Sequence, residues 1–140
     1  MNIAFFLTPK NEGAYLNTSM TMRQALEKMQ YHRYTAVPLV DKAGRYAGTL
    51  TEGDLLWYLK DHPEMSFKDT HRVRIKKIPK RVQNTPVPID ADILDLVDLA
   101  MNQNFVPVID DTRIFIGIVK RSDIINYYAK VLSEKTESTA

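Results

Sequence analysis

The sequence predicts a layered α/β (α+β) fold made of two similar halves, each with the order strand, helix, strand, strand, helix. The first observation is a repeat, because VPLVD at residues 37–41 returns as VPVID at residues 106–110, 69 positions later. The second is that an amphipathic helix pattern precedes each motif, and the third is that a glycine-containing strand and another helix pattern follow it. Repeated units of this kind predict two copies related by an approximate two-fold axis.

The first helix of each half should begin at a capping residue. Thr21 and Asp92 each precede apolar residues spaced at i, i+3, i+4 and i+7, with Gln24 and Asp95 three positions further on. A pair with this spacing satisfies unpaired N–H groups at a helix start. Through the end of these helices the two copies align at a spacing of 71, and beyond them at 69, so the second copy lacks two residues after its first helix.

The strands are predicted from short β-branched stretches. The motifs at 37–41 and 106–110 end in polar turns, and their hairpin partners follow at 46–50 and 114–119. A second helix is then expected in each half, because one helical face carries matching apolar residues. These matching residues are Leu55, Leu56 and Leu59 in the first copy and Ile124, Ile125 and Tyr128 in the second.

The expected organisation is one repeat at 1–67, a connector at 68–80, a second repeat at 81–132 and a frayed tail at 133–140. Since a copy of about 70 residues buries too little core to stand alone, the two should pack sheet to sheet. Seven lysines and arginines lie between residues 67 and 81. We interpret this segment as a solvated connector with an edge strand; a nucleic-acid patch, or a phosphate contact from Arg72 or Arg74, is the alternative.

Composition excludes several functional classes. The chain has 140 residues, a formal net charge of +2 and no cysteine. This charge does not favour nucleic acid as a partner, and the lack of cysteine excludes disulfides, thiolate zinc sites and iron–sulfur clusters. The three histidines lack metal-binding spacing, no apolar run is long enough to span a membrane, and no serine stands in a nucleophile motif. We therefore expect a cytoplasmic protein that is not an enzyme and holds no metal.

The repeated motifs resemble a tandem pair of cystathionine-β-synthase (CBS) domains, the Bateman module, of the stand-alone bacterial type. The resemblance is carried by the Val-Pro-x-hydrophobic-Asp strands and by the turn Gly-x-x-Thr-x-x-Asp at 48–54, which returns in altered form at 117–123. It implies a regulatory module that binds an adenine nucleotide such as AMP, ADP or ATP between the repeats. It also implies a homodimer that signals to a regulated protein, and it implies no cofactor.

The two turns also favour an anion on physical grounds, because each joins a strand to a helix whose first N–H groups are unpaired. In the first copy Gly48 leaves space, Thr51 can cap the helix or bind phosphate, and Asp54 can bind a ribose. Thr51 and Asp54 are equally an ordinary capping pair that needs no ligand. In the second copy Lys120 stands where the family has Thr or Ser, at a helix start that a cation disfavours.

A bound phosphate would relieve that conflict, so we interpret Lys120 and Arg121 as phosphate contacts and Asp123 as the ribose contact; an exposed basic turn is the alternative. The resemblance implies that the pocket beside Asp123 is lined by Ala14, Tyr15, Tyr34, Thr35, Ala36, Ile118, Lys120, Arg121 and Ser122. Here Tyr34 would stack on the base, and the backbone of Ala36 would read its edge. A second pocket would be lined by Thr49, Thr51, Asp54, Thr85, Pro86, Phe105 and Val106.

Two other functions remain open. Residues 34–38 resemble those of small bacterial CBS proteins that bind cyclic di-AMP, although those relatives lack an acid at the position of Asp123. The second alternative is a protein-interaction module that binds no ligand and dimerises through its helices.

Overall fold

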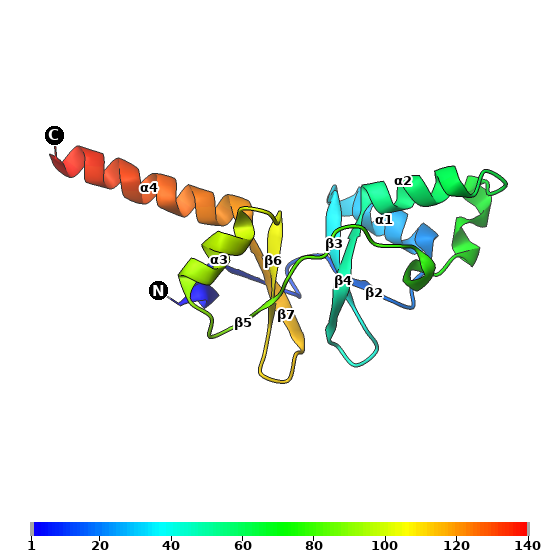
Figure 1. The fold of residues 1–140 in the computed structure, drawn as a ribbon, viewed down its shortest axis with the longest axis horizontal. Helices are drawn as coiled ribbons and strands as arrows, with labels where there is room; N and C mark the ends of the chain where they lie inside the picture. The colour runs from blue at the N-terminus through cyan, green and yellow to red at the C-terminus, as the bar shows by residue number, and fades with distance from the viewer. Residues whose placement is uncertain (1, 140) are drawn as a thin grey trace.

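The computed structural model describes residues 2–139, and its two halves repeat the same order of elements (Figure 1). The first half contains β2 (Leu16–Asn17), α1 (Met22–His32), β3 (Ala36–Val40), β4 (Tyr46–Thr51) and α2 (Glu52–Asp61). The second half contains β5 (Val87–Pro88), α3 (Ile93–Ala100), β6 (Phe105–Ile109), β7 (Phe115–Lys120) and α4 (Arg121–Thr139). The predicted fold class and the order of each repeat are confirmed.

The sheets repeat in register as well as in order. In one sheet β2 pairs parallel to β3 and β3 antiparallel to β4; in the other, β5, β6 and β7 pair in the same way. Leu16 lies opposite Leu39, and Val87 lies opposite Val108, so the pairs correspond at the spacings of 71 and 69. Residues that match in the alignment therefore occupy equivalent places in the two sheets.

The capping residues begin the helices as expected, with one difference. Thr21 Oγ1 accepts the N–H of Gln24 at 3.2 Å, and Gln24 Oε1 accepts the N–H of Thr21 at 2.9 Å. At α3, Asp92 accepts the N–H of Leu94 at 3.4 Å, and the hydrogen bonds of the described residues include no reciprocal one from the Asp95 side chain. The second capping box predicted from the sequence is therefore wrong, and α3 starts with a simple cap.

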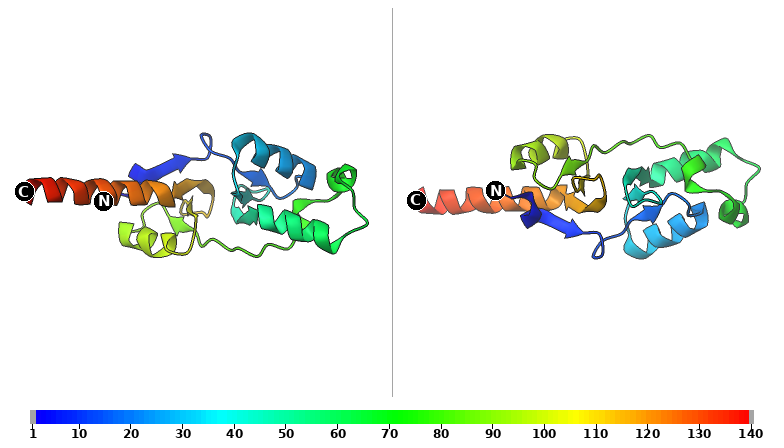
Figure 2. Two further views of the ribbon diagram at one scale, coloured as in Figure 1. Left: turned by 90° about the horizontal axis from the view of Figure 1, so that it is seen from above. Right: turned by 90° about the horizontal axis from the view of Figure 1, so that it is seen from below.

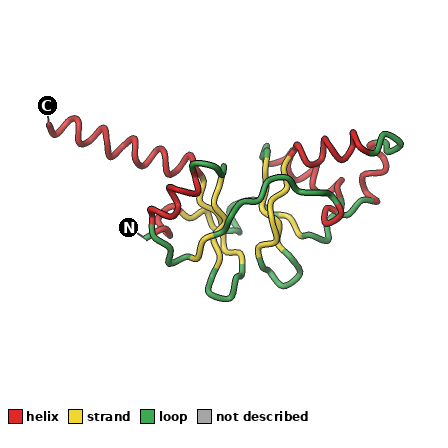
Figure 3. The backbone as a smooth tube through the Cα atoms, in the orientation of Figure 1, coloured by secondary structure: helices red, strands yellow, loops and turns green. Residues whose placement is uncertain are grey.

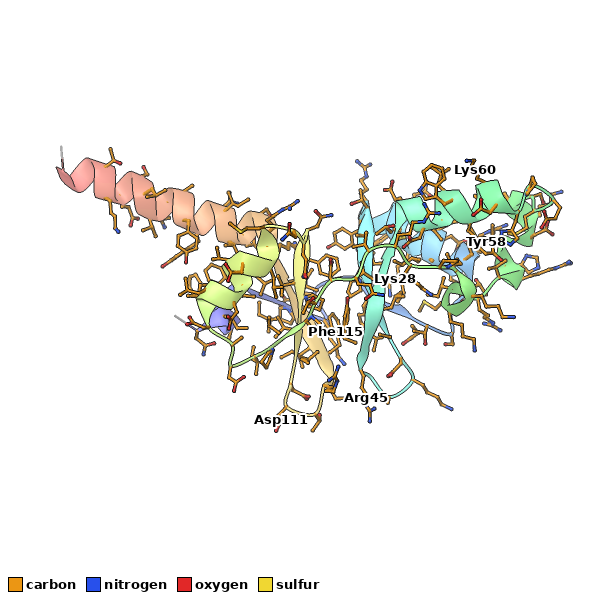
Figure 4. All side chains as sticks on the ribbon, viewed as in Figure 1. Lys28, Arg45, Tyr58, Lys60, Asp111 and Phe115 are labelled. Atoms are coloured by element: carbon orange, nitrogen blue, oxygen red, sulfur yellow. The ribbon has the colours of Figure 1, made fainter. Side chains whose placement is uncertain are left out.

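The two sheets lie side by side at the centre, with the helices on the outer sides (Figures 1 and 2). Phe115 is fully buried between them (Figure 4), with ring-centre distances of 6.1 Å to Tyr15 and 6.4 Å to Tyr46. The N–H of Phe115 also donates to the carbonyl of Gly44 at 2.9 Å. Aromatic packing and a backbone hydrogen bond thus hold the halves together near the hairpins.

The N-terminal segment packs on the second half rather than the first. Ile3 and Phe6, in a short 3-10 helix (Ile3–Phe6), are buried in the second core. Strand β1 (Leu7–Pro9) pairs antiparallel with β7, so the second sheet has the order β1-β7-β6-β5. The first repeat predicted at 1–67 therefore includes an N-terminal segment that lies with the second half in space.

Most basic side chains of the connector are exposed, as a solvated segment requires, but two of its apolar residues are packed in the core. The connector forms two 3-10 helices, Phe67–Arg72 and Ile75–Lys77, and Ile75 and Ile78 are fully buried in the first core. The predicted edge strand is wrong, because Arg74 alone makes an isolated bridge, to Thr21. Arg74 also donates to the carbonyl of Ser19 at 2.7 Å. Beyond this point the chain crosses to the second half as an extended loop (Figure 3).

The C-terminal segment from 133 to 139 continues α4, where the sequence predicts a frayed tail; residue 140 lies outside the described residues. This helix projects beyond the rest of the molecule (Figure 2). Among residues 2–139, no helix is both long and apolar enough to cross a lipid bilayer.

Candidate functional site

A cavity of about 200 Å³ is lined by elements of both halves, at the point where β7 passes into α4. Its walls include six residues that the sequence assigns to the pocket beside Asp123, namely Ala14, Tyr34, Ala36, Ile118, Lys120 and Ser122. Pro38, Asn104 and Phe105 complete the walls. The volume is below the roughly 300–1,000 Å³ of drug-sized sites, so the enclosed part suits a group no larger than a single base.

The end of α1 positions Tyr34. Arg33 terminates the helix in the left-handed conformation with φ of 59°, and the N–H of Tyr34 donates to the Met29 carbonyl at 3.1 Å. The ring of Tyr34 then stacks on His32, with 5.6 Å between ring centres and an interplanar angle of 11°. The aromatic wall of the cavity is therefore held by the helix terminus and a neighbouring ring.

The junction of β7 and α4 positions Lys120. The N–H of Arg121 donates to the Asn104 carbonyl at 3.1 Å, and its guanidinium donates to Asn104 Oδ1 at 2.7 Å. Arg121 thus fastens the helix start to β6 and is not among the cavity residues. Lys120 lines the cavity, and its ammonium makes no hydrogen bond or ion pair within residues 2–139. It is the cation available to an anion at this site.

The wall formed by the first half includes a residue whose backbone groups are unpaired within residues 2–139. Ala14 is 6% exposed, and no hydrogen bond within the described residues uses its N–H or its carbonyl. Buried backbone groups normally find partners, so an unpaired donor and acceptor on one residue favour a ligand there. Tyr15 has a structural position, because its ring contacts Phe115 and its carbonyl accepts from Lys28 Nζ at 2.8 Å.

Two further predicted residues lie near the cavity without lining it. The carbonyl of Thr35 accepts the N–H of Glu52 at 2.9 Å, which joins β3 to the start of α2. Asp123 is half-buried in the first turn of α4, directly after Ser122, and its carboxylate makes no hydrogen bond within residues 2–139. Asp123 therefore stays available at the rim, whereas Thr35 has a structural contact.

A larger cavity, of about 700 Å³, lies against β4 in the first half and includes Thr49, Thr85 and Pro86 of the second predicted pocket. Lys76, Lys80 and Arg113 also line it. Burial lowers the pKa of Lys80, and the charge of Asp54 opposes that effect. The three basic side chains nevertheless give this cavity a positive charge.

The hydroxyl of Tyr46 anchors one side of this larger cavity. It donates to the Asn84 carbonyl at 2.8 Å and lies 2.8 Å from Thr49 Oγ1. Burial raises the pKa of Tyr46, and the hydrogen bond with Thr49 partly opposes the increase. The phenol is thereby held neutral as a link between β4 and the crossing loop.

Thr51 and Asp54 form a capping box and do not line the larger cavity. Asp54 is 2% exposed; its Oδ2 accepts the N–H of Thr51 at 3.0 Å and its Oδ1 accepts the N–H of Arg81 at 3.1 Å. Both carboxylate oxygens are therefore engaged, as the capping interpretation requires. The structure also places Val106 entirely in the second core and Phe105 on the smaller cavity, which departs from the predicted second pocket.

One polar residue at the second pocket was missed from the sequence. Gln103 is 7% exposed, and its carboxamide hydrogen-bonds the N–H of Thr85 at 2.8 Å and the carbonyls of Thr85 and Phe105, each at 3.2 Å. The repeat could have indicated it, because Gln103 aligns with Tyr34 at the spacing of 69. The described side chains contain no cluster of histidine, aspartate or glutamate suited to a metal ion.

Two pseudosymmetric repeats that share a cavity at their strand-to-helix turns define a class of paired-repeat modules. The family model for the CBS domain matches this chain twice, at residues 12–61 and 75–130. The chain belongs to the CBS domain family, and its two matched regions form a tandem regulatory module. The resemblance seen in the sequence is confirmed.

Known proteins agree with this assignment. A CBS domain-containing protein of Dictyostelium discoideum is 28% identical over 124 residues, which cover 84% of this chain and 85% of the relative. The solved structure of CbpB in complex with c-di-AMP has a TM-score of 0.83 at 19% identity and covers 99% of this chain and 91% of its own. CBSX2 in complex with AMP has a TM-score of 0.74 at 19% identity, with coverages of 93% and 97%. At these identities the two structures establish the fold.

Proposed function

We propose that this chain is a regulatory protein that binds an adenine nucleotide between its two halves, with the base in the cavity beside Lys120, and passes its occupancy to a partner protein. The observation that carries the proposal is the composition of that cavity. It joins an aromatic wall at Tyr34 with a backbone at Ala14 and an ammonium at Lys120 that have no partner within residues 2–139. These groups suit a base, its polar edge and a phosphate respectively.

The ligand would act by bridging the two halves. Ala14 and Tyr34 come from the first half, whereas Ile118 and Lys120 come from the second. A nucleotide held by both sets favours one relative orientation of the halves by the difference between its affinities for the alternatives. No bond in the ligand needs to be made or broken, so the proposed role is sensing in the cytoplasm and not catalysis.

The test is calorimetric titration with AMP, ADP, ATP, cyclic di-AMP and adenosine. At least one adenine nucleotide should bind, and it should raise the melting temperature because it binds only the folded state. If every titration at millimolar concentration gives no heat and no thermal shift, the proposal fails and a ligand-free interaction module is favoured. Binding of cyclic di-AMP alone would identify the alternative receptor function.

Lys120→Met tests the phosphate contact. Losing one charge-assisted hydrogen bond should weaken AMP binding about tenfold or more, while adenosine binding should not change. Lys130→Met is the matched control, since Lys130 is exposed further along α4. Equal losses for AMP and adenosine would contradict a phosphate contact by Lys120.

A homodimer is part of this proposal. Leu56 on α2 and Ile125 on α4 are equivalent residues at the spacing of 69, and they are 60% and 57% exposed. Apolar side chains exposed at equivalent places in both halves favour a surface that is covered by a second copy.

A further inference from the structure

The two halves differ sharply at two pairs of equivalent positions. Ala14 corresponds to Thr85 at the spacing of 71, and Tyr34 corresponds to Gln103 at the spacing of 69. In the first half Ala14 has an unpaired N–H and carbonyl beside the Tyr34 ring. In the second half the carboxamide of Gln103 occupies both groups of Thr85. The backbone N–H and carbonyl at this position are thus unpaired in the first half and hydrogen-bonded to a side chain in the second.

The pair of hydrogen bonds between Gln103 and Thr85 shows which kind of group these backbone atoms can bind. Gln103 Oε1 accepts the N–H of Thr85 at 2.8 Å, and Nε2 donates to the Thr85 carbonyl at 3.2 Å. A carboxamide presents an acceptor beside a donor, and the Watson–Crick edge of adenine does the same through N1 and its amino group. Guanine presents the reverse order, with a donor at N1 and an acceptor at O6. The pairing therefore matches adenine, whereas guanine bound in the same orientation would set donor against donor and acceptor against acceptor.

We propose that the Gln103 side chain occupies the position of a base at Thr85 and so blocks nucleotide binding there. Each chain therefore binds one adenine nucleotide, at Ala14. This inference rests on the proposed nucleotide-binding function and adds its stoichiometry and base selectivity. Removing the carboxamide opens a latent second site, whose base edge pairs with the backbone of Thr85.

The surroundings of Thr85 support a latent nucleotide site. Thr85 lies on the wall of the 700 Å³ cavity, which is large enough for a sugar and phosphate outside the base position. Lys76, Lys80 and Arg113 line the same cavity, and its lining residues include no acidic side chain. Gln103 itself is buried, so its carboxamide and the base compete for one position and cannot both bind there.

Gln103→Ala is the direct test, with AMP as the probe and GMP as the comparison in calorimetric titrations. The wild type should bind one AMP per chain and Gln103→Ala two, and GMP should bind each site at least about tenfold more weakly than AMP. Circular dichroism and a thermal melt confirm that the variant is folded. If the wild type and Gln103→Ala both bind one AMP, Gln103 does not close a site and the inference is overturned.

Other outcomes separate this inference from the proposed function. If the wild type binds no AMP and Gln103→Ala binds one, the site at Ala14 fails while the latent site stands. Absence of AMP binding by both proteins overturns this inference, whereas the proposed function fails only if no adenine nucleotide binds the wild type. Equal binding of AMP and GMP overturns the assigned base edge.

A reciprocal variant keeps the test valid even if Gln103→Ala does not fold. Tyr34→Gln should place a carboxamide beside Ala14 and close the open site, whereas Tyr34→Leu removes the ring without adding such a group. AMP should therefore bind Tyr34→Gln at least about tenfold more weakly than Tyr34→Leu. Equal affinities for these two variants would overturn the competition between a glutamine side chain and the base.

Discussion

The N–H of Arg81 donates to Oδ1 of Asp54 at 3.1 Å and fastens the crossing loop to the first turn of α2. The other carboxylate oxygen accepts the N–H of Thr51. Asp54 therefore stabilises a junction of three segments, whereas its repeat equivalent Asp123 makes no hydrogen bond within the described residues. One acid of the repeated motif has a structural role, and the other is available to a ligand.

Asp54→Ala should lower the free energy of unfolding by about 2 kcal/mol, because it removes the reciprocal hydrogen bond of the capping box and leaves the N–H groups of Thr51 and Arg81 without their partner. Asp123→Ala should change stability by less than about 0.5 kcal/mol and should weaken nucleotide binding. Urea denaturation measures the first effect and calorimetric titration the second. Equal stability losses in the two variants would contradict this division of roles.

Gly117→Ala should destabilise the protein far more than Gly48→Ala. A Cβ on Gly117 would lie 2.4 Å from the carbonyl oxygen of Thr8, whereas a Cβ on Gly48 would meet no atom within 4 Å. We expect a loss of about 2 kcal/mol or more at position 117, from displacement of β1. At position 48 we expect about 1 kcal/mol, from its φ of 138°. Thermal or urea unfolding of both variants tests this order, and a reversal would contradict the close approach of β1.

Tyr46 should make stability fall at alkaline pH. Burial raises the pKa of Tyr46 above its usual value of 10.0, so the unfolded chain loses this proton at a lower pH than the folded protein. The stabilisation is complete below about pH 10 and is lost as the pH rises through the folded pKa. Urea unfolding at about pH 8 and about pH 11 should show a smaller decline for Tyr46→Phe than for the wild type.

Tyr31→Phe is the matched control for this pH effect, because Tyr31 is highly exposed. It should show the same alkaline decline as the wild type. At neutral pH, Tyr46→Phe should cost about 1 kcal/mol, from the lost hydrogen bond to the Asn84 carbonyl. A decline in Tyr46→Phe as steep as that of the wild type would show that another group causes the pH dependence.

The double variant Leu56→Glu with Ile125→Glu should convert a homodimer into a monomer. Four added carboxylates in one dimer would face an apolar surface, and burying them without partners is strongly unfavourable. Sedimentation velocity measures the change, and an unchanged circular dichroism spectrum shows that the fold persists. Lys42→Glu, on an exposed hairpin turn, is the control for the change in charge. A wild-type protein that sediments as a monomer would contradict the proposed surface.

The repeat register made much of the fold and of the smaller cavity predictable. Equivalent residues occupy equivalent places in both sheets, so the turn at Lys120 and the start of β3 at Ala36 could be brought together from spacing and the family resemblance. The pairing of β1 with β7 in the second half was not predictable, because a strand of three residues is too short to show a periodic pattern. The packed part of the connector was missed, because its many charges conceal Ile75 and Ile78, whose burial depends on tertiary packing.

Gln103 was missed for a different reason. A buried carboxamide has no local signature, and its contacts with Thr85 join segments 18 residues apart. The C-terminal part of α4 likewise lacks the apolar periodicity from which helices are predicted, although its residues have no strong helix breaker before 139.

Placing β1 beside β7 interlocks the two repeats. A fragment that starts after residue 10 would leave one edge of the second sheet without its backbone partners and would expose the site that Ile3 and Phe6 fill. A fragment that ends before residue 75 would remove Ile75 and Ile78 from the opposite core. Cutting the chain at its apparent midpoint would therefore yield two incomplete pieces, and neither repeat is expected to fold independently.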